Sequence, residues 1–93
     1  MFSALRQYRV VPILKAKTLE VSDALSVADA LVRAGLPVLE IMFRRFSDSK
    51  AIKAISSAHP DFWIGAGDIV SHDQLVRAID SKAKFAVAPG VNP

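Results

Sequence analysis

The residues with the clearest chemical potential stand at the end of one apolar run. Glu40 lies inside Val38–Phe43, and Arg44 follows the run directly. Burial raises the pKa of a carboxyl group and makes it a candidate general acid or base, but burial is costly unless the group is paired or functional. A guanidinium at a strand end can hold a carboxylate or phosphate through two parallel hydrogen bonds. A structural ion pair of Glu40 with Lys15 or Arg44 is the alternative, and the sequence leaves both open.

The ends of three other apolar runs carry further candidates. Lys15 follows the first run, Gly65, Gly67 and Asp68 close the third, and Pro89 follows the fourth. The glycines would let the backbone approach a bound ligand closely. Each candidate also has a structural alternative, as a surface lysine, a glycine turn, a turn cap or a turn proline. We therefore expect a ligand site where the strands end, with these five residues as candidates for substrate binding.

Several other kinds of site are not indicated by the sequence. His59 and His72 lie at predicted helix edges, cysteine is absent, and no cluster has metal-ligand spacing, so we expect no metal and no cofactor. The 12 Lys and Arg residues are scattered among 9 Asp and Glu, which disfavours a nucleic-acid partner and suits a small anionic substrate.

No apolar run approaches the ~18 residues of a membrane span, and no signal peptide is recognisable. We expect a cytoplasmic protein.

Strand-like and helix-like patterns alternate along the chain. Short apolar runs predict strands, and apolar residues at helical spacing predict helices. Gly35 follows the first helix, where a left-handed residue is wanted, Ser47 is the expected cap of the second, and Ser71 with Gln74 forms a capping box for the third. The predicted elements are strand 10–14, helix 22–34, strand 37–43, helix 47–58, strand 62–67, helix 75–79 and strand 84–88.

Alternation along the second strand predicts which side chains face the helices, because successive strand residues point to opposite faces of a sheet. The fully apolar set should meet the helices and consists of Leu39, Ile41 and Phe43. The other set should face the ligand side and consists of Val38, Glu40, Met42 and Arg44.

The order βαβαβαβ predicts an α/β fold with a parallel sheet. Two architectures share this order. One is half of a TIM (β/α)8 barrel, with all helices outside, and the other is a flavodoxin-like open sheet with helices on both faces. A closed barrel needs ~250 residues, so we expect residues 1–93 to form a single domain, an N-terminal half-barrel. Such an arc exposes strand edges and the face around Val38 and Met42, which predicts a homo-oligomer or a missing C-terminal half.

Four segments, in this order and spacing, resemble one enzyme family. They are VVPIL at 10–14, AGLPVLEI at 34–41, IGAG at 64–67 and FAVAPG at 85–90. Together they are similar to the 2-keto-3-deoxy-6-phosphogluconate (KDPG) and 2-keto-4-hydroxyglutarate aldolases. The resemblance implies a class I aldolase on a (β/α)-barrel, usually trimeric. Such an enzyme cleaves a 2-keto-3-deoxy-6-phospho or 2-keto-4-hydroxy acid to pyruvate and an aldehyde, through a Schiff base with a lysine on the sixth strand.

The resemblance also implies roles for individual residues. Glu40 matches the glutamate that moves protons, and Arg44 matches the arginine that binds the substrate carboxylate. The remaining candidates match positions near the substrate pocket and are Lys15, Gly65, Gly67 and Pro89.

The chain departs from the family pattern in two respects. Asp68 stands where the family usually has a threonine that helps to hold the pyruvate carboxylate, and a negative charge would repel that carboxylate unless it is protonated or paired. The 93 residues stop before the sixth strand, so they lack the Schiff-base lysine and are expected to be inactive alone. The alternative function is a non-catalytic half-barrel scaffold that binds carboxylate or phosphate and self-associates.

Overall fold

The computed structural model describes residues 11–14 and 20–88. Its strands and helices follow the predicted order. They are β1 (Ile13–Leu14), α2 (Val21–Arg33), β2 (Val38–Met42), α3 (Phe46–Ala58), β3 (Trp63–Gly67), α4 (His72–Asp80) and β4 (Phe85–Ala86). Helix α4 begins earlier than predicted, at His72 rather than Leu75, because the capping box of Ser71 and Gln74 starts it directly.

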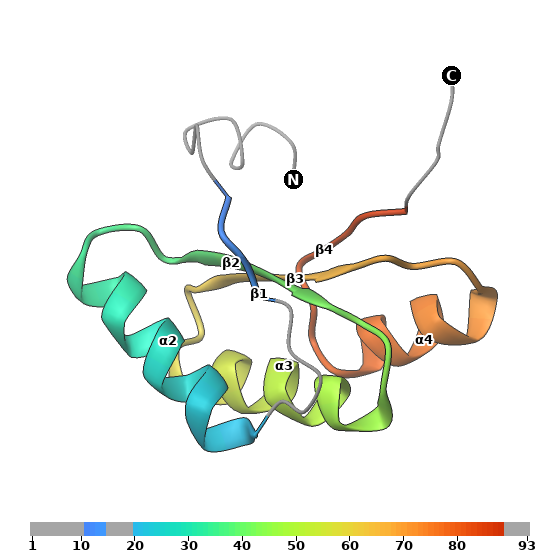
Figure 1. Cartoon of the computed structure of the whole chain (residues 1–93), viewed down its shortest axis with the longest axis horizontal. Helices are drawn as coiled ribbons and strands as arrows, with labels where there is room; N and C mark the ends of the chain where they lie inside the picture. The colour runs from blue at the N-terminus through green and yellow to red at the C-terminus, as the bar shows by residue number, and fades with distance from the viewer. Residues whose placement is uncertain (1–10, 15–19, 89–93) are drawn as a thin grey trace.

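The four strands form one parallel sheet in the order β1-β2-β3-β4. Figure 1 shows α2, α3 and α4 on the same side of this sheet. Sequential parallel strands with every described helix on one face are the arrangement of a barrel arc. A doubly wound sheet would reverse its strand order and carry helices on both faces. The half-barrel prediction is therefore confirmed, and the flavodoxin-like alternative is wrong.

The hydrophobic core lies between the sheet and the helices. Leu39, Ile41 and Phe43 are buried in it, which confirms the predicted helix-facing set. They pack in one cluster with residues of all three helices, namely Ala24, Ala28, Ala51, Ile52, Ile55 and Ala78. The half-barrel was expected to expose the opposite face around Val38 and Met42. For Val38 this expectation is wrong, because its side chain is fully buried. Its register partner on β3 is Trp63, a large side chain that shares its face.

The ends of the helices explain their lengths. Gly35 has a φ of 78° after α2, and the N–H groups of Gly35 and Leu36 donate to the carbonyl oxygens of Val32 and Leu31. This is the left-handed termination predicted for Gly35.

Helices α2 and α3 have 13 residues and α4 has 9. Within the described ranges, no helix combines the length and the apolar character needed to cross a membrane.

The start of α3 differs from the prediction. Its N-cap is Arg45, and Ser47 lies inside the helix. The side chain of Asp48 does the capping, because its Oδ2 accepts from the backbone N–H groups of Arg44 at 2.9 Å and Arg45 at 2.8 Å. Asp48 is 1% exposed, and a carboxylate in the first turn also interacts favourably with the helix dipole.

Replacing Asp48 by Ala is expected to lower the free energy of unfolding by about 1–3 kcal/mol, because two backbone N–H groups lose their acceptor in a buried place. Ser47→Ala is the matched control and should change stability by less than about 0.5 kcal/mol. Urea unfolding followed by circular dichroism measures both. Equal losses in the two variants would contradict the assignment of the cap to Asp48.

Candidate functional site

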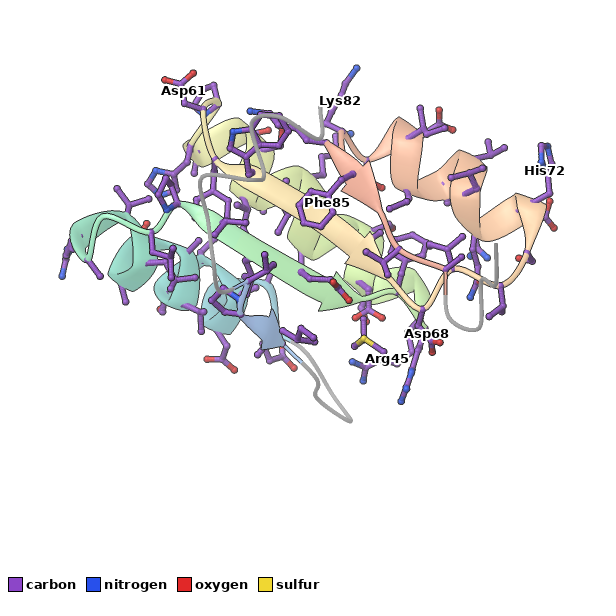
Figure 2. All side chains as sticks on the ribbon, turned by 90° about the horizontal axis from the view of Figure 1, so that it is seen from above. Arg45, Asp61, Asp68, His72, Lys82 and Phe85 are labelled. Atoms are coloured by element: carbon purple, nitrogen blue, oxygen red, sulfur yellow. The ribbon has the colours of Figure 1, made fainter. Side chains whose placement is uncertain are left out.

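The carboxyl ends of β2 and β3 bring two predicted site residues together. Nε of Arg44 donates to Oδ2 of Asp68 at 3.0 Å, although the two residues are 24 positions apart. Adjacent parallel strands end at the same edge of a sheet, so residues that follow them meet there. Figure 2 shows Asp68 at this end of the sheet. The side chains are 61% exposed for Arg44 and 27% for Asp68, so the pair is open to solvent.

Glu40 lies on the face of β2 that is turned away from the helices. Its neighbours Leu39 and Ile41 belong to the helix-side core, and its register partner on β3 is Gly65. Its carboxylate reaches further along the sheet, because a Cβ added to Gly67 would collide with Glu40 Oε2. The carboxylate therefore lies over Gly67, toward the strand ends where Arg44 and Asp68 pair, as the alternation predicted for its face.

Phe85 is a part of this face that sequence reasoning missed. It pairs with Gly65, and a Cβ added to Gly65 would overlap the Phe85 ring. Figure 2 shows the ring lying over the sheet on the side away from the helices. The space above the two glycines is thus filled by side chains of this chain, the Phe85 ring and the Glu40 carboxylate. Only the register of β3 with β4 reveals the contact.

The peptide bond between Phe43 and Arg44 is held from both sides. Nε2 of Gln74 donates to the Phe43 carbonyl oxygen at 3.2 Å, and Asp48 accepts from the Arg44 N–H. Oε1 of Gln74 also accepts from the N–H of Val70 at 2.7 Å. Side chains of α3 and α4 therefore fix the backbone from which the Arg44 side chain extends. The capping box had predicted only the contact of Gln74 with Ser71.

Two of the predicted substrate-binding residues, Lys15 and Pro89, lie outside the described residues. The other predicted substrate-binding residues are Arg44 and Asp68, which pair at the strand ends, and Gly65 and Gly67, which lie beneath side chains of the face that carries the predicted catalytic residue Glu40. Within the ranges that the structure describes, no group of three or more His, Cys, Asp or Glu side chains is arranged to hold a metal ion.

Alanine substitutions of the two glycines are expected to have different effects. In Gly67→Ala the new methyl group displaces the Glu40 carboxylate, which ends a flexible side chain, so unfolding free energy should fall by at most about 1 kcal/mol. In Gly65→Ala it meets the buried Phe85 ring, and overpacking should cost about 1–3 kcal/mol. Thermal unfolding compares the two variants. A larger loss in Gly67→Ala would mean that the Glu40 carboxylate is held rigidly.

Similarity to known proteins covers nearly the whole chain. A family model for the KDPG and KHG aldolases matches residues 1–93. The 2-dehydro-3-deoxy-phosphogluconate aldolase of Haemophilus influenzae is 39% identical over 89 residues, which are 96% of this chain and 41% of the relative. The crystal structure of the 2-keto-3-deoxy-6-phospho-gluconate aldolase from Zymomonas mobilis has a TM-score of 0.84 at 33% identity, over 98% of this chain and 43% of that one.

A third relative carries a bound reactant. The KDPG aldolase of Legionella pneumophila, with pyruvate captured at low pH as a covalent carbinolamine intermediate, has a TM-score of 0.73 at 34% identity. The match covers 88% of this chain and 38% of that one. The chain thus spans less than half the length of each of these three relatives.

Proposed function

The chain belongs to the KDPG and KHG aldolase family, and from that premise we propose that it forms the N-terminal half of the active site of an aldolase-type lyase. The substrate is a 2-keto-3-deoxy-6-phospho or 2-keto-4-hydroxy acid, and the products are pyruvate and an aldehyde. The observation that carries this proposal is the Glu40 carboxylate on the face of the sheet turned away from the helices, over Gly67 at the end of β3. The pyruvate captured in the Legionella relative supports a 2-keto acid as the ligand.

In the proposed reaction, a lysine amine condenses with the keto carbon of the substrate and releases water. The Schiff-base nitrogen accepts the electron pair of the C3–C4 bond as that bond breaks. The C4 hydroxyl group loses its proton to the Glu40 carboxylate and becomes the aldehyde. Glu40 then gives a proton to the three-carbon enamine, and hydrolysis releases pyruvate. Arg44 holds the substrate carboxylate throughout and so fixes the keto carbon in place.

By family resemblance the Schiff-base lysine stands on a sixth strand, beyond these 93 residues. We therefore propose that the 93 residues bind the keto acid but do not turn it over by themselves. Borohydride reduction in the presence of pyruvate, followed by intact mass measurement, is expected to leave the chain unmodified. A reduced adduct on Lys15 would overturn this part of the proposal.

Binding without turnover is tested by nuclear magnetic resonance. Pyruvate should shift the backbone amide signals of Glu40 and Arg44, and Arg44→Ala should abolish the shifts. Arg33→Ala is the matched control, because it removes an exposed arginine from the end of α2, and it should leave the shifts in place. Shifts that persist in Arg44→Ala would contradict the role proposed for Arg44.

We also propose that another βα unit covers the outer edge of β4, either from a second copy of this chain or from the rest of a barrel. A groove of about 210 Å³ lies between α4 and β4, lined mainly by apolar residues that include Leu75, Ile79 and Ala83. Ile79 is 61% exposed there. Exposed apolar surface beside a strand edge is typical of an interface.

Light scattering at micromolar concentration should therefore find self-association of the 93-residue chain. Ile79→Lys is expected to shift the chain toward monomer, because a charge would have to be buried in the contact. Val32→Lys on α2 is the matched control at another exposed apolar position and should leave association unchanged. A cooperatively folded monomer of the unaltered chain would overturn the proposal that a second copy covers the edge of β4.

A further inference from the structure

We propose that Asp68 is a specificity-determining residue that acts as an internal carboxylate on Arg44, so that a ligand carboxylate must displace it to be held. This inference rests on the proposed function, in which Arg44 receives the carboxylate of a 2-keto acid. Its basis is the hydrogen bond from Arg44 Nε to Asp68 Oδ2, at 3.0 Å.

The hydrogen bond to Asp68 occupies Nε of Arg44, which a ligand carboxylate bound side-on would need. Arginine binds a carboxylate with two parallel N–H groups, and the side-on mode needs Nε together with a terminal nitrogen. Asp68 already accepts from Nε. A ligand carboxylate must therefore displace Asp68 or bind end-on beside a second negative charge, and both reduce its affinity.

Both partners are set in place by the backbone. The Arg44 backbone is held by Asp48 and Gln74 through the peptide bond that precedes it. Asp68 has a φ of 61°, in the left-handed region that aspartate and asparagine tolerate better than other side chains apart from glycine. The backbones that carry the two side chains are therefore held at neighbouring strand ends, and the pair stays within reach of the solvent from which a ligand arrives.

The size of the effect follows from the exposure of the pair. An exposed ion pair shifts an equilibrium by at most about a factor of five. A ligand that competes with Asp68 should lose up to about that factor in affinity, and repulsion between the two carboxylates adds to the loss. A neutral analogue does not compete for the guanidinium, so the pair selects against carboxylates in particular.

Asp68→Asn is the appropriate test, because asparagine keeps the shape and tolerates the positive φ, whereas a β-branched threonine would be strained there. The probes are acetate, pyruvate and the neutral analogue pyruvamide, titrated into the 93-residue chain and followed at the Arg44 Nε–H resonance. We expect acetate and pyruvate to bind about fivefold more tightly to Asp68→Asn, with pyruvamide changed by less than about twofold. Asp61→Asn removes the same charge from an exposed turn and should change none of the three.

The outcomes separate this inference from the proposed function. Unchanged carboxylate affinity in Asp68→Asn, or an equal gain for pyruvamide, would overturn the role of Asp68 even where pyruvate binds through Arg44. A gain for acetate with no preference for pyruvate would support the competition and count against the keto-acid site. No binding of either carboxylate to either form would overturn both.

Discussion

Replacing Glu40 by Gln is expected to lower the turnover of aldol cleavage by about 10²–10⁴-fold, the usual contribution of a positioned general acid–base group. The glutamine side chain has nearly the same shape and can still lie over Gly67, but it cannot take up the hydroxyl proton or return one to the enamine. A suitable protein is a hybrid barrel in which these 93 residues replace the matching part of the Haemophilus relative, so that a Schiff-base lysine is supplied. Release of pyruvate is the measured quantity.

Glu20→Gln is the matched control for this experiment. It removes the same charge from the only other glutamate, which is exposed at the N-cap of α2 and makes no side-chain cap hydrogen bond. Its turnover should stay within about twofold of the parent hybrid. A Glu40→Gln hybrid with equal turnover would show that another group moves the protons, and the face that carries Glu40 would then serve only for binding.

The local features of the fold were predictable from the sequence because they depend on near neighbours. Gly35 ends α2 in the left-handed region, and the Ser71 capping box begins α4, as their residue types indicate. The cap of α3 was mispredicted, because serine and aspartate are both good capping residues. The choice between Ser47 and Asp48 depends on whether the helix begins after Arg45 or after Ser47, which residue types alone do not decide.

The places of Glu40, Arg44 and Asp68 on the sheet were predictable from the sequence, but their contacts were not. Alternation along β2 placed Glu40 on the correct face, and the apolar runs placed Arg44 and Asp68 at strand ends. Their ion pair depends on the register between β2 and β3, which the pattern of either strand alone does not specify. The contact of Gln74 with the Phe43 carbonyl spans 31 positions, and it is visible only after α4 is packed against the end of β2.

Removing buried volume from the helix-facing side of β2 is expected to have the largest effect on stability. Ile41 has no exposed surface and packs in the helix-side core, so Ile41→Ala should lower the free energy of unfolding by about 2–5 kcal/mol. A small domain has about 5–15 kcal/mol in total, so this one change takes a large share. Ile41→Val should cost about 0.5–1.5 kcal/mol and keeps the measurement possible where the alanine variant does not fold.

Met42→Ala is the matched control, because the next residue along β2 points to the opposite face and is only half-buried. It should cost at most about half as much as Ile41→Ala, since less apolar surface is lost from the core. Urea unfolding can be followed by the fluorescence of Trp63, the single tryptophan of the chain. A larger loss of unfolding free energy in Met42→Ala than in Ile41→Ala would mean that the face carrying Met42 and Glu40 packs against the helices. A carboxylate facing the helices could not reach a ligand at the strand ends, so the stability of these two variants also tests the orientation on which the proposed chemistry depends.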